Sequence, residues 1–182
     1  MDVIYKNYII LCLFFICITN ISYGQIINFQ GQVPITFTVI SNVNFGQVIT
    51  NEGTVSILKG GTGMGKLKVT GQENLDITVN IPSIVKLYDA SNSNYMNYTI
   101  RAAYNNLGKD NYIQTKPFNL PTQTFRMVGR NQGPPAPPPT PSHKGYTPPS
   151  GSAWMYLFGD LNVTNVPAGS YHGTIPITVI YN

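Results

Sequence analysis

Two segments at opposite ends of the chain alternate strictly between apolar and polar residues. From position 27 to 39 the odd positions are apolar or glycine, and the even positions are Asn, Gln, Pro or Thr. From Gly169 to Tyr181 every second residue is again apolar or glycine. Because a strand points successive side chains to opposite faces, each segment is predicted to be a strand with one apolar face.

Between these ends, short apolar runs bounded by Gly, Asn and Pro predict further strands. The runs cover residues 43–48, 54–58, 67–71, 75–81, 96–104, 125–129 and 154–163, the last one kinked near 159–160. No segment shows a helical period of useful length. We therefore expect an all-β, Ig-like antiparallel β-sandwich of roughly eight or nine short strands. The expected core contains Ile77, Val79, Tyr98, Ile100, Trp154 and Phe158.

Residues 1–24 are predicted to be a secretory signal peptide. Lys6 lies in a short polar start, residues 9–18 are mostly apolar, and Ser22-Tyr-Gly24 places small residues before a cleavage site. The apolar stretch is too short for a comfortable membrane span, and polar sequence follows it. We expect cleavage before Gln25, no membrane span in the mature chain, and passage through the periplasm to the cell surface or the medium.

Cysteine and charge narrow the classes of function. Both cysteines, Cys12 and Cys17, lie in the predicted signal peptide, so the mature chain would have no disulfide and would depend on its core. Thiolate metal sites and cysteine nucleophiles are thereby excluded. The formal net charge of +4 is spread along the sequence, and no run of basic residues predicts nucleic-acid binding.

Candidate catalytic and metal-binding residues are few. His143 and His172 have no second metal ligand at a useful spacing. Asp89 and Asp110 lie in loops rich in Asn and Ser, without the dense oxygen ligands of a calcium motif. We expect no enzyme activity, no cofactor and no bound metal.

Two other segments look like recognition motifs but favour simpler interpretations. Residues 60–66 have the GxxxxGK spacing, yet Leu67 replaces the required hydroxyl residue and the flanks are strands, so a glycine-rich hairpin turn is expected. Residues 133–150 hold eight prolines and are predicted to form an extended surface loop inserted between two strands.

The C-terminal segment carries the most specific pattern. Gly169 stands fourteenth from the end and Tyr181 is next to last, both on the same face of the predicted strand. This pattern resembles the C-terminal motif of chaperone–usher pilin subunits. With Phe45-Gly46, the glycine-rich turn at 60–65 and the Val69-Thr-Gly71 turn, the chain from about residue 33 to 182 is similar to a family of small secreted bacterial proteins. That family is itself similar to spore coat protein U and to pilins.

The resemblance implies a pilin-like sandwich and an assembly function. In pilin subunits the last strand borders an open groove, which a chaperone strand fills first and the N-terminal strand of the next subunit fills later. The implied groove-edge residues are Gly169, Tyr171, Ile175, Ile177, Val179 and Tyr181. The implied donor residues, within an extension at 25–33, are Ile27, Phe29, Gly31 and Val33. The implied partners are other copies of the chain, an Ig-like periplasmic chaperone and an outer-membrane usher.

A second interpretation stays open beside it. Residues 27–39 can also form one long first strand of their own sandwich, in place of an extension that ends at Pro34 and a single domain at 34–182. The protein would then be a stand-alone secreted module for adhesion or ligand binding. The extension is shorter than in many pilins, and familiar pilins often carry a disulfide that this mature chain would lack.

Overall fold

The computed structural model describes residues 33–128 and 149–182. The predicted signal peptide, the donor residues Ile27, Phe29 and Gly31, and most of the Pro-rich segment lie outside the described residues. The elements are β1 (Thr36–Ser41), β2 (Gly53–Ile57), β3 (Gly65–Gln72), β4 (Asp76–Asn80), β5 (Ile84–Tyr88), β6 (Tyr95–Asn105), β7 (Lys116–Pro117), β8 (Thr122–Arg126), β9 (Ser150–Val163) and β10 (Thr178–Tyr181). This part of the chain contains no helix long and apolar enough to cross a membrane.

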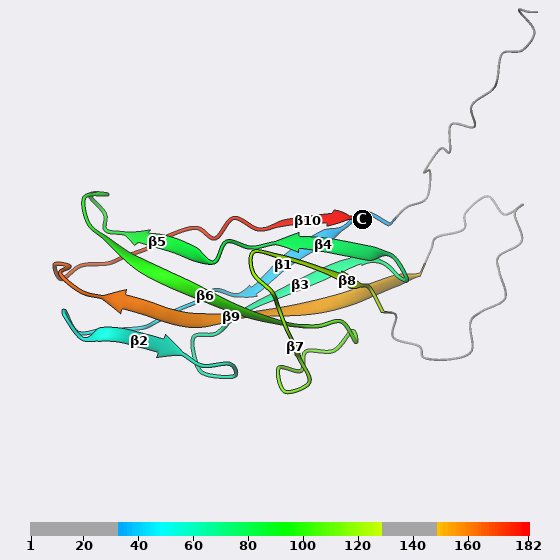
Figure 1. The fold of residues 1–182 in the computed structure, drawn as a ribbon, viewed down its shortest axis with the longest axis horizontal. Coiled ribbons are helices and arrows are strands. Elements are labelled where there is room, and N and C mark those ends of the chain that lie inside the picture. The colour runs from blue at the N-terminus through cyan, green and yellow to red at the C-terminus, as the bar shows by residue number, and fades with distance from the viewer. Residues whose placement is uncertain (1–32, 129–148) are drawn as a thin grey trace, which may run out of the picture. The chain divides into compact units, whose positions relative to one another are not determined.

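The strands form two antiparallel sheets (Figure 1). The larger sheet has the order β1-β3-β9-β6-β5, with β2 also paired to β9 and β7 to β6. The smaller sheet has the order β10-β4-β8. The predicted all-β antiparallel sandwich is therefore confirmed. Strand β1 is an edge of the larger sheet and β10 is an edge of the smaller one, and this pair of edges matters for the site below.

The main hydrophobic core lies between the two sheets. Ile77 and Val79 from β4 meet Tyr98 and Ile100 from β6 there, and all four side chains are buried as predicted. Burial of each large apolar side chain stabilises the fold by about 1.5–3 kcal/mol. These residues alternate with exposed or partly exposed neighbours along their strands, which is why the pattern in the sequence located them.

The predicted core positions on β9 are wrong by one residue. Ala153, Met155 and Leu157 face the main core, whereas Trp154 and Phe158 lie on the opposite face of the sheet and are only partly buried. The pairing of β9 with β6 runs from residue 154 to 162 without a register shift, so no kink changes the face. Trp154 and Phe158 pack instead against a second, smaller cluster of Ile57, Met64 and Tyr156. The prediction chose the wrong face because that face carries the larger aromatic side chains.

The predicted strand at 43–48 is a loop. Asn44 accepts a hydrogen bond through its side-chain oxygen from the backbone N–H of Gly46, at 2.8 Å, and Gly46 has a positive φ of 70°. Such an Asx turn competes with an extended backbone. The apolar side chains Val43, Phe45 and Val48 still pack against the core. The apolar residues of this segment therefore indicated burial correctly, although the segment is not a strand.

Candidate functional site

An open groove of about 1200 Å³ lies between β1 and the C-terminal segment that precedes β10. One wall is β1 and the loop that follows it, represented by Phe37, Val39 and Phe45. The other wall is the C-terminal segment before β10, represented by Ile175 and Ile177. The floor is formed by core-facing side chains of the larger sheet, which include Leu67, Met96, Tyr98, Leu157 and Leu161. The groove therefore leads from the surface directly to the hydrophobic core.

The walls of the groove expose apolar side chains. Phe37 is 41% exposed and Val39 is 51% exposed, although both belong to the alternating pattern that normally marks a buried face. On the opposite wall Tyr171, Ile175 and Ile177 are only partly buried. Exposed apolar surface of this kind indicates an interaction site more often than a resting surface.

Backbone groups on both walls lack sheet partners among the described residues. Within residues 33–128 and 149–182, strand β1 pairs only with β3, and its other edge has no partner strand. Strand β10 pairs only with β4, and the preceding residues 173–177 form no ladder. Unpaired edges are templates for another strand. The groove thus offers both hydrogen-bonding edges and apolar walls to an extended peptide.

Tyr181 ties the end of β10 to the larger sheet. Its hydroxyl donates to the carbonyl oxygen of Val33 at 2.6 Å and accepts from the backbone N–H of Gln72, also at 2.6 Å. The hydroxyl lies so close to Gly71 that a Cβ there would be 2.8 Å away. The next-to-last tyrosine therefore joins β10, β3 and the entry to β1, and only glycine fits beneath it.

The C-terminal segment differs from the single long strand that the alternation predicts. The ladder begins at Thr178, and before it only a bridge between His172 and Tyr88 connects the segment to β5. Pro176 has no N–H to donate, and no neighbouring strand lies on the groove side among the described residues. The alternation in exposure nevertheless continues from position 175 to 181, so the predicted apolar face is present without the predicted pairing.

The two glycines of this segment have different surroundings. A Cβ at Gly173 would lie 2.6 Å from the carbonyl oxygen of Lys86, so the close approach to β5 requires glycine. A Cβ at Gly169 would meet only the ring of Tyr171, at an ordinary 3.8 Å. Gly169 is exposed, lies outside any strand and lines the groove. Neither a close contact nor a positive φ therefore requires glycine at position 169, and there is room for a side chain.

The floor of the groove is held rigidly by Tyr98. Its hydroxyl donates to the carbonyl oxygen of Phe158 at 3.0 Å, and its ring meets Phe45 edge-on with centroids 5.2 Å apart. Burial, with a smaller contribution from the charge of Asp160, raises the pKa of Tyr98 well above its ordinary value. The phenol is therefore neutral and acts as a structural donor.

The other residues considered from sequence are accounted for by local structure. The carboxylate of Asp89 accepts hydrogen bonds from Ser91, Ser93 and Asn94 in the β5–β6 turn, and that of Asp110 accepts one from Tyr156. The described residues contain no group of three or more His, Cys, Asp or Glu side chains placed to hold a metal.

Sequence reasoning identified only one wall of the groove. Of the proposed donor residues, the described part contains Val33 alone, which bonds to Tyr181 and does not line the groove. The opposite wall, formed by Phe37, Val39 and the loop at 43–48, was missed as a binding surface because alternation alone predicts burial. The sequence did contain a pattern that the two walls share, since both alternate between apolar and polar residues with a period of two.

Comparisons with known proteins give little further information. No family model matches the chain, and no curated protein matches it. A solved structure described as a chaperone–tip adhesin complex of CFA/I fimbriae biogenesis is 15% identical with a TM-score of 0.39. The match covers 81% of this chain and 42% of that one, so this chain spans less than half of its length. A likeness at this TM-score supports no functional argument.

Proposed function

We propose that this protein is a secreted, pilin-like structural subunit that assembles by strand exchange at the bacterial surface. The observation that carries the proposal is the open groove between β1 and the C-terminal segment, with exposed Phe37 and Val39 on one wall. The occupant in the assembled state is residues 25–33 of another copy. Their alternating Ile27, Phe29, Gly31 and Val33 suit a site that has apolar walls and free strand edges.

The shape of the groove favours a strand over a small molecule. Small-molecule pockets are usually enclosed cavities of about 300–1,000 Å³ with a few convergent polar groups. This groove is larger, at about 1200 Å³, and runs between β1, at the edge of the larger sheet, and the C-terminal segment before β10. A strand inserted between the edges would pair its backbone with them and place every second side chain on the apolar floor.

The position of Val33 supports exchange between copies over closure by the same chain. Its carbonyl oxygen accepts from Tyr181 and its N–H donates to the side chain of Gln72 at 3.4 Å. If residues 25–32 returned into their own groove, the chain would have to reverse direction here, beside Pro34. That reversal would compete with both hydrogen bonds.

An exposed apolar groove also explains why partners would be needed during export. Free strand edges with apolar walls promote uncontrolled pairing between copies. We therefore include in the proposal an Ig-like periplasmic chaperone, which fills the groove in transit, and an outer-membrane usher, which exchanges it for the next subunit. The alternative, a stand-alone secreted adhesion or ligand-binding module, requires neither partner.

The test compares two neighbouring substitutions in the extension. Phe29→Asp places a charge on the face that would enter the groove, at a cost of several kcal/mol, on the order of 2–7 kcal/mol. Gln30→Asp introduces the same charge on the opposite face. We expect the wild type and Gln30→Asp to form heat-stable ladders in unheated gels and large species in size-exclusion chromatography. Phe29→Asp should give a folded monomer.

Each contrary result has a defined meaning. If Phe29→Asp lowers the melting temperature of a monomer, residues 25–33 belong to their own sandwich and the stand-alone module is the better interpretation. If the wild type remains monomeric at high concentration, with and without a denaturation–renaturation cycle, assembly by exchange is wrong. A matching pair on the groove wall, Val39→Asp against Thr38→Asp, should reproduce the same contrast from the acceptor side.

A further inference from the structure

A second surface feature lies away from the groove, where two loops meet on the outer side of the larger sheet. The β2–β3 turn and the β6–β7 loop hold each other there. The ring of Tyr112 packs directly against Gly60, whose positive φ of 86° and missing side chain make the contact possible. The Nζ of Lys59 donates to the hydroxyl of Thr115 at 3.0 Å.

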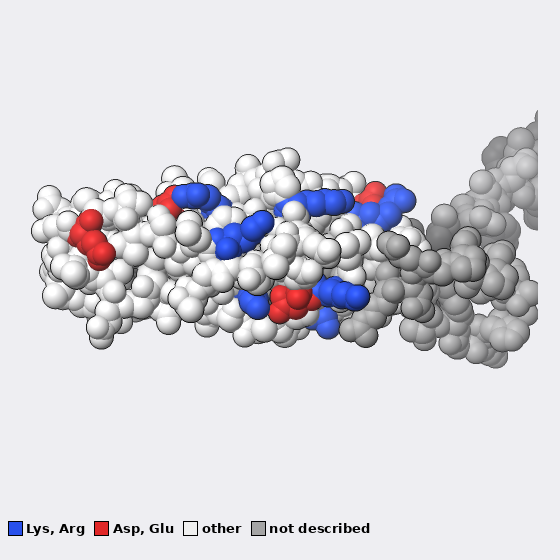
Figure 2. All heavy atoms as spheres, turned by 90° about the horizontal axis from the view of Figure 1, so that it is seen from below, with Lys and Arg blue, Asp and Glu red and all other residues white. Residues whose placement is uncertain are grey.

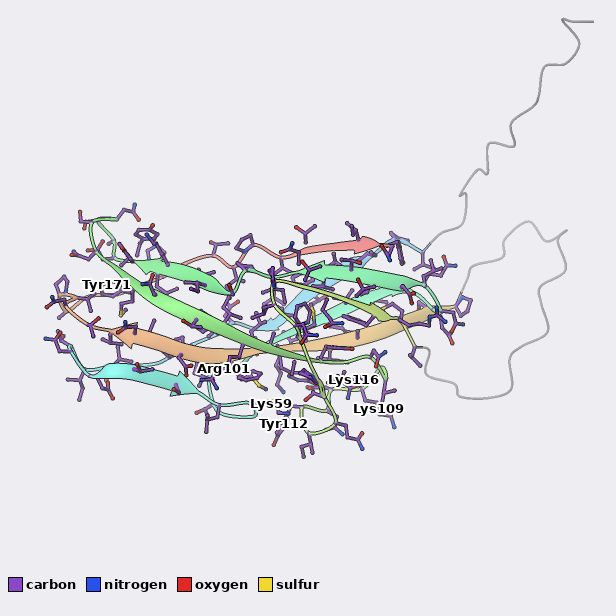
Figure 3. All side chains as sticks on the ribbon, viewed as in Figure 1. Lys59, Arg101, Lys109, Tyr112, Lys116 and Tyr171 are labelled. Carbon is purple, nitrogen blue, oxygen red and sulfur yellow. The ribbon has the colours of Figure 1, made fainter. Side chains whose placement is uncertain are left out.

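These loops display basic and aliphatic side chains together. Figure 3 shows that Lys59, Lys109, Tyr112 and Lys116 lie near one another below β6, in the region of β7. Figure 2, which views the side with β2 and β7, shows basic side chains gathered over the middle of this face. We define the lysine patch as Leu58, Lys59, Lys109, Tyr112, Ile113 and Lys116, all of them exposed.

The charges of the lysine patch are not neutralised by neighbours. No carboxylate of the described residues lies within 4.0 Å of Lys59, Lys109 or Lys116. The one acidic residue in the β6–β7 loop, Asp110, is held by Lys66 at 3.2 Å and by the hydroxyl of Tyr156 at 2.9 Å. Three ammonium groups therefore face solvent beside a carboxylate whose charge is already compensated.

The aliphatic members of the patch are unusually exposed. Ile113 is 73% exposed and Leu58 is 69% exposed, and among the large apolar side chains of the described residues only Ile49, at 75%, exceeds them. Both sit next to a patch residue that anchors the loops, Tyr112 or Lys59. Exposed aliphatic tips flanked by lysines combine the two terms that bind a protein to the surface of an anionic bilayer.

We propose that the lysine patch binds the surface of membranes that contain anionic lipids. The ammonium groups of Lys59, Lys109 and Lys116 would lie at the lipid phosphates, and Leu58 and Ile113 would enter the boundary between headgroups and acyl chains. An acidic polysaccharide would use the charges but not the aliphatic tips, so it accounts for only half of the patch. None of the patch residues lines the groove, and this inference is independent of strand exchange.

The test uses co-sedimentation of the purified exported protein with vesicles. Equal parts of phosphatidylglycerol and phosphatidylcholine are compared with phosphatidylcholine alone. We expect binding to the anionic vesicles only, weakened by added salt. The double variant Lys109→Gln/Lys116→Gln should reduce the partition coefficient about 25-fold, at about fivefold per lysine. The charge-matched control Lys86→Gln/Arg126→Gln, away from the patch, should change it less than about twofold.

A second matched pair tests the aliphatic contribution. Ile113→Ser should weaken binding about fivefold, whereas Ile49→Ser, equally exposed in another loop, should leave it unchanged. Absence of binding to anionic vesicles overturns the proposal. Equal losses in the two double variants also overturn it, since binding would then follow net charge alone. Binding to dextran sulfate that resists Ile113→Ser, without vesicle binding, assigns the patch to acidic polysaccharide instead.

Discussion

At the scale of single residues, the next-to-last tyrosine ties the C-terminal strand to the larger sheet. The hydroxyl of Tyr181 donates to the carbonyl oxygen of Val33 and accepts from the N–H of Gln72, and these two residues are themselves neighbours. Gly71 supplies the space for this hydroxyl. A tyrosine on the alternating face of the tail was visible in the sequence, but its partners lie 148 and 109 residues away along the chain. No local pattern could predict them.

We expect Tyr181→Phe to destabilise the domain by about 1–3 kcal/mol, because the variant leaves a partly buried donor and acceptor unpaired. The measurement is urea denaturation followed by fluorescence. Tyr95→Phe is the control, since Tyr95 is exposed and no hydrogen bond of its hydroxyl is found among the described residues, and it should change stability by less than about 0.5 kcal/mol. Equal effects of the two substitutions would contradict the structural role of Tyr181.

Asp89 gives a prediction for the dependence of stability on pH. The hydrogen bond from the side chain of Asn94, at 2.8 Å, is the largest cause that lowers the pKa of Asp89 to about 2. Because the pKa in the folded state lies below the ordinary value of 3.8, this carboxylate stabilises the fold above about pH 4. That contribution is lost as the pH falls through about 2.

The melting temperature of the wild type should therefore fall more steeply between about pH 4 and pH 2 than that of Asp89→Asn. At neutral pH the variant should be the less stable of the two, because an amide replaces a charged acceptor in the β5–β6 turn. Parallel melting curves across this range would show that the turn does not depend on the ionised carboxylate.

At the scale of elements, the period of two predicted most strands and the sandwich correctly, since alternation depends only on which face meets the core. It failed where both faces of a strand contact apolar residues. On β9 the core face carries Ala153 and Met155, while the larger Trp154 and Phe158 lie on the other face. Residue size suggested the wrong face.

The period of two also cannot distinguish an apolar face that is covered from one that awaits a partner. Phe37 and Val39 continue the pattern of a buried strand face, yet they are among the more exposed apolar residues. The reason is topological, because β1 and β10 are edges of different sheets and are not paired with each other. The groove exists because of how the strands pair into two separate sheets, which the sequence pattern does not reveal. Only the C-terminal wall of the groove was suggested by the sequence.

The tail allows a prediction about a whole element. Deleting residues 175–182 removes β10, its pairing with β4 and the partly buried side chains that pack on the core. Four large side chains are lost, each contributing up to about 1.5–3 kcal/mol when buried, against a net stability of about 5–15 kcal/mol. We expect no soluble, protease-resistant product on export.

The control for this deletion is Ile180→Ser, which changes the solvent side of the same strand. Ile180 is 54% exposed, so the substitution should leave the yield and protease resistance near those of the wild type. Recovery of the truncated protein at wild-type levels would show that the C-terminal wall of the groove is not needed for folding.

At the scale of the whole molecule, the described part of the sandwich is open between β1 and the C-terminal segment that precedes β10. The larger sheet is continuous from β1 to β5, whereas the smaller one has only β10, β4 and β8. The space between β1 and the C-terminal segment has the edges and the apolar walls of a missing strand. Anything that fills it with paired backbone and apolar side chains must stabilise the folded state by mass action.

The groove can therefore be titrated directly. A synthetic peptide of residues 25–33 is added to the Phe29→Asp protein, whose own extension cannot compete for the groove. At a free peptide concentration of about 100 times its Kd, the folded state gains about 2.7 kcal/mol. For a domain of this size the melting temperature should rise by roughly 5–11 °C.

The same peptide carrying Phe29→Asp should give no shift, whereas the Gln30→Asp peptide should act like the wild type. If the three peptides behave alike, or none shifts the melting temperature at saturating concentration, the groove does not recognise this strand. Any heat-stable oligomers that the full-length chain forms on gels would then have to arise from another contact.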